Sequence, residues 1–293
     1  MGSAIRHLSA ASEVPLVAAA LFNSTVGIWN LHTNQLISQF DTTLSFGGKR
    51  LSISPDGQRC VAANWTKGQR GGVACYDTQT GNRLWHRTDI GQTQFLQFSY
   101  NGTGIWCGVE AGSLQCLNSA TGATMQALAR VRRMVDNSYT DGQLVIKTGP
   151  KDFLVRGEKS FSIPRLSFVL LHAVFGRDSI CLSEAGGPVR CFDCRSGEER
   201  WRYQPGKGAH VLNMAFRKTD GCYYGIEWEY ETGSFRVLLR FSAESGPQQK
   251  ICNLTSCEET FGLHGDVLVT SIGEVIDVAE GGILNQLSFP QND

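Results

Sequence analysis

The sequence has no net charge and no long apolar stretch, and these two absences exclude several classes of protein. Its 293 residues contain 27 Lys and Arg against 27 Asp and Glu, which removes a general attraction to nucleic acid or to an anionic membrane surface. Its best apolar run, residues 15–22, is eight residues long, whereas a span of the bilayer needs roughly 20. No small-residue cleavage pattern follows this run. We therefore expect a cytoplasmic protein that binds neither membrane nor nucleic acid.

The sequence also has almost no helical periodicity, whereas one short pattern recurs six times. A large apolar residue is followed by Asp, Asn or Ser, two free positions, usually Thr or Ser, and then Gly. The copies begin at Trp29, Tyr76, Leu117, Phe192, Phe241 and Ile276. The Asp, Asn or Ser side chain can accept hydrogen bonds from backbone N–H groups two residues on, and the final Gly, or Asn34, tolerates a positive φ. Each copy therefore predicts a tight hairpin.

The spacing of the copies predicts seven repeating units. Their first residues are 47, 41, 75, 49 and 35 residues apart. The interval of 75 has room for one further unit, and residues 152–163 contain two short apolar runs around a trimmed hairpin at the expected place. Seven units of about 41 residues therefore account for the chain.

A second turn precedes the first in most units, as in Ser54-Pro55-Asp56-Gly57 and Asn101-Gly102, and apolar runs flank it. Each unit then contains four short antiparallel strands, the pattern of a propeller blade. We predict an all-β fold, a single seven-bladed β-propeller domain over residues 1–293, in which no terminal strand is exchanged between the first and last blades. The expected blades cover residues 4–42, 47–89, 92–129, 131–164, 166–204, 209–252 and 256–290.

These motifs resemble those of the WD-repeat and quinoprotein-like β-propellers. Ser54-Pro55-Asp56-Gly57 is similar to the first inner turn of a WD-repeat blade, and Trp29-Asn30 stands where that family has Trp-Asp. The Gly-His dipeptide of WD repeats is absent. Residues 80–85 and 196–201, which end at Trp85 and Trp201, resemble the Thr-Gly-x-x-x-Trp of quinoprotein repeats. The resemblance implies a propeller over essentially the whole chain.

The ten cysteines are too sparse for a disulfide scaffold. Seven of them fall at two repeated strand positions, which predicts small buried core residues in a reducing compartment. These are Cys60, Cys75, Cys107, Cys116, Cys181, Cys191 and Cys222. Cys191 and Cys194 form the single C-x-x-C motif, but a zinc site needs a second pair of ligands. We expect no metal and no cofactor.

An enzyme is the alternative that the resemblance raises. Quinoprotein oxidoreductases typically have eight blades, a longer chain, an adjacent Cys-Cys pair and export to the periplasm, none of which this sequence shows. We expect instead that Trp85 and Trp201 dock their outermost strands on the neighbouring blade. A small ligand or quinone in the central channel, contacted by His172 and His210, stays open as the second hypothesis.

Two long connections between second and third strands indicate a candidate binding face. In a propeller these connections emerge on the same face as those between blades. The blade 2 connection is basic, the blade 6 connection is acidic, and each carries a tryptophan, a residue that interface hot spots favour. Three arginines enter blade 4 from that face. The candidate partner-binding residues are Trp65, Lys67, Arg70, Arg130, Arg132, Arg133, Glu227, Trp228, Glu229, Tyr230 and Glu231.

The sequence therefore predicts a non-catalytic platform, monomeric on its own, that binds another protein through this face. A scaffold subunit and a neutralising, immunity-type binder of a toxin or enzyme would look alike at this level. A structural interpretation competes for part of the face, because alternating Glu227, Glu229 and Glu231 could be the solvated side of a strand with Trp228 and Tyr230 packed inward.

Overall fold

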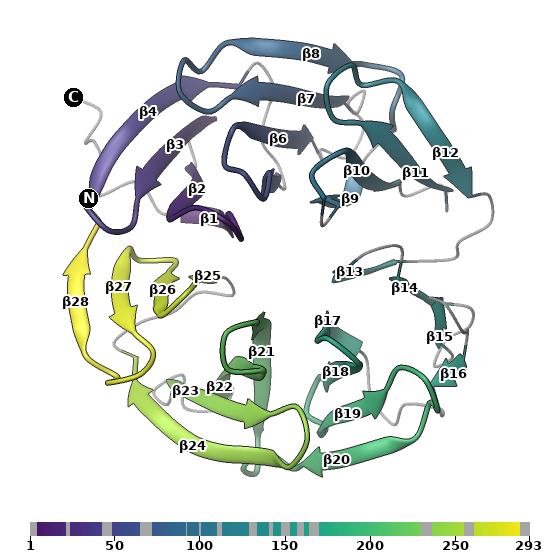
Figure 1. Ribbon diagram of the computed structural model, residues 1–293, viewed down its shortest axis with the longest axis vertical. Helices are drawn as coiled ribbons and strands as arrows, with labels where there is room; N and C mark the ends of the chain where they lie inside the picture. The colour runs from purple at the N-terminus through teal and green to yellow at the C-terminus, as the bar shows by residue number, and fades with distance from the viewer. Residues whose placement is uncertain are drawn as a thin grey trace. The chain divides into compact units, whose positions relative to one another are not determined.

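The computed structural model consists of short antiparallel β-strands (Figure 1). It describes residues 5–21, 24–42, 49–64, 72–91, 93–99, 101–109, 113–128, 134–140, 143–147, 153–156, 161–163, 170–229, 236–254 and 261–287. Within these ranges, no helix has the length and apolar character to cross a membrane.

Every sheet is formed by four consecutive strands in chain order. The first contains β1 (Ile5–Ala10), β2 (Leu16–Leu21), β3 (Thr25–Asn30) and β4 (Gln35–Asp41). The second contains β5 (Lys49–Ile53), β6 (Arg59–Asn64), β7 (Gly72–Asp77) and β8 (Arg83–Arg87). The third contains β9 (Thr93–Phe98), β10 (Gly104–Val109), β11 (Ser113–Asn118) and β12 (Thr124–Leu128). The fourth contains β13 (Met134–Thr140), β14 (Gln143–Lys147), β15 (Phe153–Arg156) and β16 (Phe161–Ile163).

The remaining sheets have the same order of strands. The fifth contains β17 (Leu170–Phe175), β18 (Ser179–Glu184), β19 (Val189–Asp193) and β20 (Glu199–Tyr203). The sixth contains β21 (Ala209–Arg217), β22 (Cys222–Glu229), β23 (Arg236–Ser242) and β24 (Gly246–Asn253). The last contains β25 (Phe261–His264), β26 (Val267–Thr270), β27 (Glu274–Asp277) and β28 (Ile283–Gln286). The predicted all-β class and the four-stranded antiparallel blades are confirmed.

The sheet β13–β16 departs from the repeating unit, and this corrects the predicted blade count from seven to six. Its last two strands have only four and three residues, and the pairing of β13 with β14 shifts between Met134 and Tyr139. The sequence between β15 and β16 also lacks the recurring turn motif, so the local chemistry that closes the other outer hairpins is missing. The structure thus has six blades of the repeating kind and one shorter sheet, in place of a seven-bladed propeller.

Contacts within the chain divide it into two compact units. Unit 1 comprises residues 1–130, 260–277 and 283–293, and unit 2 comprises residues 131–259 and 278–282. Unit 1 therefore holds the first three blades with the strands of the last blade, and unit 2 holds the sheets from β13 to β24. The single domain over residues 1–293 stays a prediction.

The recurring motif forms the hairpin that the sequence predicted. The side-chain oxygen of its second residue accepts the N–H groups of the residues two and three positions on, as in Asp77 with Gln79 at 3.1 Å and Thr80 at 2.8 Å. The same pair of bonds is made by Asn30, Asn118, Asp193 and Ser242. The closing residue has a positive φ in all six copies, 56° at Asn34 and 72° at Gly81, for example.

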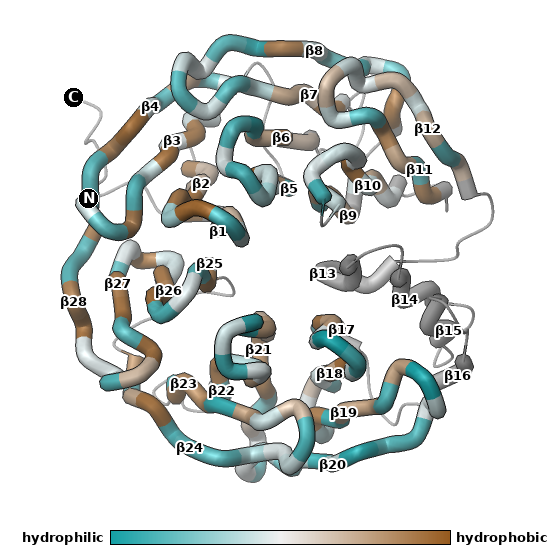
Figure 2. The backbone as a smooth tube through the Cα atoms, in the orientation of Figure 1, coloured by the Kyte–Doolittle hydropathy of each residue, from teal (hydrophilic) through white to brown (hydrophobic). Residues whose placement is uncertain are grey.

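The apolar core lies between neighbouring blades, because each inner strand has two buried faces. Along β6, Cys60 and Ala62 pack with β2 and β3 of the first blade, whereas Val61 and Ala63 pack with the third blade. Side chains alternate between the faces of a strand, so such strands are nearly continuous apolar runs. Figure 2 shows the contrast with β20, an outer strand that is hydrophilic over most of its length.

One hydrogen bond between blades recurs at the outermost strands. The indole Nε1–H of Trp85 donates to the carbonyl of Ser119 at 2.9 Å in unit 1, and that of Trp201 donates to the carbonyl of Ala243 at 3.2 Å in unit 2. Ser38 occupies the same repeat position and its hydroxyl donates to the carbonyl of Thr78. The prediction that the two tryptophans dock their strands on the next blade is confirmed.

The cysteines belong to this core, as predicted. All seven at the repeated positions are buried, and the nine cysteines in the described part of the chain are free thiols. Burial raises the pKa of the Cys75 and Cys191 thiols to about 12, which keeps them protonated and unreactive at neutral pH. Cys257 lies outside the described residues.

The first and last blades pack together within unit 1 without exchanging a strand, as predicted. Ile5, Leu8 and Val17 of the first blade form one cluster with Val269 and Val275 of the last. At one end of this contact, His264 Nδ1 lies 2.7 Å from the carbonyl oxygen of Ala11.

We expect Trp85→Phe to lower the free energy of unfolding by about 1 kcal/mol, because it removes the indole donor to Ser119 but keeps an aromatic ring in place. Trp85→Ala should cost about 2–3 kcal/mol, since the half-buried ring is also lost from its packing. Urea unfolding followed by circular dichroism measures both. Leu84→Ala is the matched control, because Leu84 is the preceding, exposed residue of β8, and it should change stability by less than about 0.5 kcal/mol. Equal losses at the two positions would contradict the role given to the indole.

Candidate partner-binding site

Three of the predicted partner-binding residues lie in the described part of the structure. Glu227, Trp228 and Glu229 form the end of β22. The others lie outside the described residues: Trp65, Lys67, Arg70, Arg130, Arg132, Arg133, Tyr230 and Glu231. The structure therefore describes the part of the predicted face that belongs to the sixth sheet, β21–β24, in unit 2.

Trp228 is the centre of a row of three side chains on one face of the sixth sheet. It pairs with His210 of β21 and with Arg236 of β23 in the strand register. The His210 ring meets the indole edge-on, with 5.4 Å between the ring centroids, and the Arg236 guanidinium carbon lies 5.9 Å from the indole centroid. Burial lowers the pKa of His210, so its imidazole is neutral at neutral pH. A half-buried indole is thus held between an imidazole and a cation.

Glu227 faces the other side of the sheet and binds the end of β20 and the connection between β20 and β21. Its Oε2 accepts the Tyr203 hydroxyl at 2.5 Å, and its Oε1 accepts the Gly206 N–H at 3.1 Å. Both carboxylate oxygens therefore hold a neighbouring segment in place. This contact brings the connection between blades and the end of β22 to the same edge of the sheet, the arrangement from which the binding face was predicted.

A buried ion pair on the adjacent blade was not predicted from the sequence. Arg190 of β19 is 6% exposed and Glu184 of β18 is 1% exposed. The Arg190 guanidinium lies 3.8 Å from the Glu184 carboxylate and 2.5 Å from that of Glu199, and it also covers the Phe192 ring. Two partners for one buried cation are what a low-dielectric interior requires. The sequence does contain a signal for this buried ion pair, namely an arginine inside the apolar run from Val189 to Phe192.

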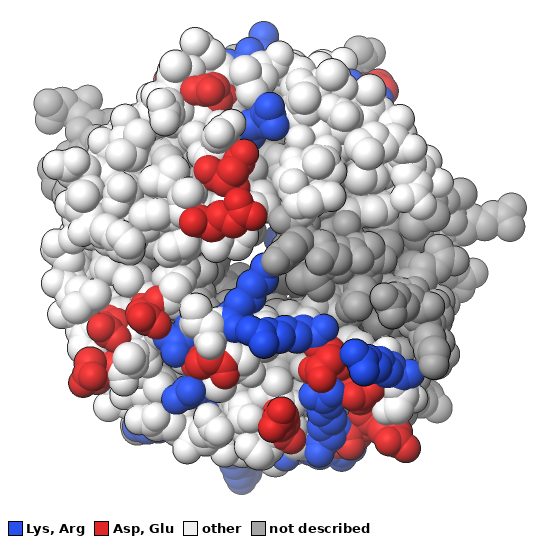
Figure 3. All heavy atoms as spheres, in the orientation of Figure 1, with Lys and Arg blue, Asp and Glu red and all other residues white. Residues whose placement is uncertain are grey.

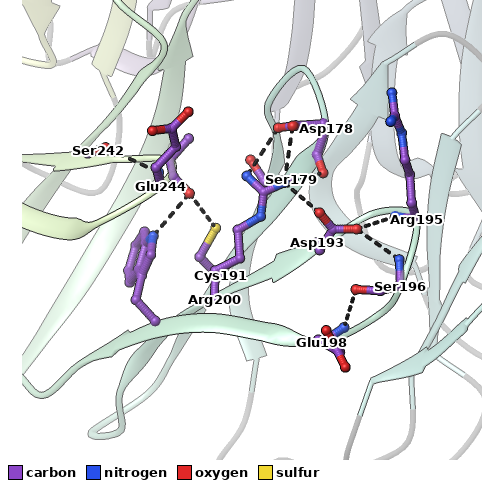
Figure 4. A network of polar contacts seen from close by, with 12 residues as sticks. Asp178, Ser179, Cys191, Asp193, Arg195, Ser196, Glu198, Arg200, Ser242 and Glu244 are labelled. Carbon is purple, nitrogen blue, oxygen red and sulfur yellow. Dashed lines mark hydrogen bonds and ion pairs between the residues drawn. The ribbon is translucent and has the colours of Figure 1, made fainter.

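A second polar network surrounds Asp193 at the opposite end of β19 (Figure 4). Arg200 binds both Asp193, at 2.5 Å, and Asp178, at 3.1 Å. The Arg200 guanidinium and the backbone N–H groups of Ser196 and Arg195 hold the pKa of Asp193 well below its usual range. Figure 3 shows basic and acidic side chains lying next to one another over this sheet. These charges are committed to each other, which favours a structural role.

The C-x-x-C motif and the two histidines of the second hypothesis all lie in unit 2. In the ranges that the structure describes, no group of three or more His, Cys, Asp or Glu side chains is arranged to hold a metal ion. Burial raises the pKa of Cys194 to about 12, so the C-x-x-C motif lacks a reactive thiolate. His172 lies on β17 and His210 on β21, where the His210 ring packs against Trp228.

No family model matches the sequence, and no curated protein matches it. Solved structures do match the fold. Those of U3-55K and of the WD40 repeats of RRP9 are 12% and 11% identical, with TM-scores of 0.72 and 0.71; each covers 92% of this chain, and the match spans 88% and 87% of those chains. Hsv2 of Kluyvelomyces marxianus is 12% identical, with a TM-score of 0.71 over 98% of this chain and 100% of its own. The predicted resemblance to WD-repeat propellers is thereby confirmed as a likeness of fold.

The depressed pKa of Asp193 predicts a pH-dependent contribution to stability. A carboxylate whose pKa is lowered by folding stabilises the protein above its unfolded pKa of about 4, and this contribution is lost as the pH falls below that value. Asp193→Asn should keep the turn, because Asn30 and Asn118 accept the same N–H bonds, but it loses the attraction to Arg200. We expect it to cost about 1 kcal/mol or less at pH 7, since the pair is partly exposed, and less still at pH 3.

Denaturant unfolding at both pH values measures this difference. The control is Asp77→Asn, because the Asp77 carboxylate makes the same turn and is bonded by Thr80 rather than by an arginine. A loss from Asp193→Asn that stays constant between pH 7 and pH 3 would show that Arg200 does not act through the carboxylate charge.

Proposed function

We propose that this protein is a non-catalytic platform that binds another protein at the edge of the sixth sheet, β21–β24, with Trp228 as the central contact. The observation that carries the proposal is the row of His210, Trp228 and Arg236 across three adjacent strands. Tryptophan and arginine are the residues most enriched where binding energy concentrates. A half-buried indole with a guanidinium beside it offers a partner both an apolar surface and a positive charge.

The rigidity of this edge supports the same function. The Glu227 carboxylate fixes the connection before β21 through Tyr203 and Gly206, and Trp228 is packed between side chains of its own sheet. A surface that is ordered before binding loses less conformational entropy on association. Glu227 is therefore a positioning residue of the site, and Trp228 and Glu229 remain proposed contacts.

The wider role stays as the sequence predicted it. We place the protein in the cytoplasm, as a monomer that acts by recognition and carries out no catalysis, either as a scaffold subunit or as a neutralising binder. Its partner is a protein, and neither nucleic acid nor a membrane is required. The basic connection of blade 2 and the arginines at 130–133 belong to the proposed face, although they lie outside the described residues.

Trp228→Ala should abolish or strongly weaken partner binding while leaving the fold intact. Affinity purification of the tagged protein from nuclease-treated native lysate, with quantitative mass spectrometry, identifies the partner, and calorimetry with the purified partner then gives Kd. We expect Trp228→Ala to raise Kd about 30-fold, which corresponds to a hot-spot loss of about 2 kcal/mol, and Arg236→Ala to have a smaller effect in the same direction.

Met125→Ala is the matched control, because Met125 is an exposed apolar residue of β12 in the other unit. Its Kd should equal that of the unaltered protein. If the Trp228→Ala and Arg236→Ala variants both bind the partner with unchanged Kd, this edge is excluded as the binding site. Turnover of a quinone by the purified protein would overturn the non-catalytic role.

A further inference from the structure

A pocket at the outer rim of unit 2 is used neither by the core nor by the proposed partner site. It has a volume of about 190 Å³ and lies between the end of β20 in the fifth sheet and strands β23 and β24 of the sixth. Tyr203 forms one side of this rim pocket, and residues 239–241 and 247–250 form the other. Figure 1 shows that β20 and β24 follow one another along the rim.

An extra bulge distinguishes β24 from the other described outer strands. The hairpins β3–β4, β7–β8, β11–β12, β19–β20 and β27–β28 each have one register shift, next to the turn. The pairing of β23 with β24 has that shift between Arg240 and Phe241 and a second one between Leu238 and Leu239, which leaves Ile251 without an opposite residue. A bulge bends the strand that carries the extra residue, so β24 departs from the path of the other outer strands beside the rim pocket.

The rim pocket has apolar walls and a cation on its exposed side. Residues directly opposite in a sheet project from the same face, so Leu239 lies beside Lys250, and Phe241 lies beside Pro247. The Tyr203 ring meets the Phe241 ring edge-on, with 5.3 Å between the centroids. Phe241 is buried, whereas Lys250 is exposed. A ligand entering from solvent therefore passes the ammonium group before it reaches the rings.

The charge of the rim pocket favours an anionic ligand. Its lining, drawn from the described residues, contains no carboxylate. Side chains alternate between the faces of a strand, so Arg240 projects from the opposite face, where its guanidinium lies 3.2 Å from the Asp220 carboxylate. The Tyr203 hydroxyl is already bonded to Glu227. Lys250 therefore determines the sign of the charge that the pocket presents.

We propose that the rim pocket binds a peptide segment of another protein in which one large apolar side chain lies next to an acidic residue. Small-molecule sites usually have volumes of about 300–1,000 Å³, and this smaller pocket suits a single side chain. Its apolar walls remove that side chain from water, and Lys250 binds the neighbouring carboxylate.

The edge of β24 indicates that the peptide is recognised by its side chains. Pro247 has no backbone N–H to donate, and the two bulges interrupt the ladder. Proline, lysine and bulges on an edge strand are features that prevent a further strand from adding to the sheet. The specificity of the rim pocket therefore comes from its walls and its cation.

The inference does not rest on the proposed partner site. The rim pocket lies on the face of the sixth sheet that carries Glu227, whereas Trp228 projects from the other face. The two sites can therefore be tested separately, and Trp228→Ala should leave peptide binding at the rim pocket unchanged.

NMR titration of the isotope-labelled full chain with the peptide acetyl-Gly-Asp-Phe-Asp-Gly-amide tests the inference. We expect the amide resonances of residues 239–250 to shift with a single saturable Kd. Peptides with Asn in place of both Asp residues, or with Ala in place of Phe, should each bind about fivefold more weakly. Lys250→Glu should bind the acidic peptide about tenfold more weakly and should prefer a peptide with Lys in place of both Asp residues.

Lys218→Glu is the matched control, because Lys218 is an exposed lysine of the same unit that does not line the rim pocket. It should bind the acidic peptide like the unaltered protein. The inference is overturned if these resonances show no saturable shift at millimolar peptide, if the three peptides bind the unaltered chain equally, or if Lys250→Glu keeps the original preference. Inorganic phosphate that displaces the peptide at equal concentration would also overturn it, because the pocket would then be a general anion site.

Discussion

The turn between the third and fourth strands is the constraint on which the blades depend. Its Asp, Asn or Ser side chain accepts two backbone N–H groups, and its last residue takes a positive φ, so the outermost strand returns along its own sheet. The same turn fixes a carbonyl that points to the preceding blade. That carbonyl, at Thr78, Ser119 or Ala243, accepts the side-chain donor of Ser38, Trp85 or Trp201. Closing one blade therefore also creates the acceptor that attaches its neighbour.

Attachment through both faces explains the unusual residues of the inner strands. A strand buried on two sides has room for large side chains at some positions and for small ones at others, as at Ala18, Ala19 and Ala20 and at the cysteines of the repeated positions. Gly27 shows the limit of this space, because a Cβ there would lie 2.0 Å from the Trp29 ring. The thiols are thus volume-matched core residues, and the high pKa that burial gives Cys75 and Cys191 follows from the packing.

What could be predicted from the sequence was the part of the fold that local chemistry determines. The six hairpins, their positive-φ residues and the docking of Trp85 and Trp201 follow from short motifs read at fixed spacing. The interval of 75 residues correctly placed strands at 153–163 but could not show that the sheet there is shorter than a blade. Side-chain contacts between residues far apart in the sequence could not be predicted, because no short motif or spacing marks them. The alternation of Glu227 with Trp228 suggested a solvated carboxylate, whereas Tyr203 at the end of β20 and Gly206 of the connection that follows both bind it.

The distribution of tryptophans separates what the fold requires from what function can use. Trp29 fills the cluster between the first and last blades, and Trp85 and Trp201 make the repeated bond to the next blade, so a change at any of them alters the packing of blades. Trp228 instead contacts His210 and Arg236 of its own sheet, beyond the positions that the repeat uses. Known propellers keep this fold at identities of 11–12%, which shows how few residues the architecture dictates. A large, half-buried aromatic therefore stands at a strand end where the repeat does not demand one, and the proposed partner site rests on this observation.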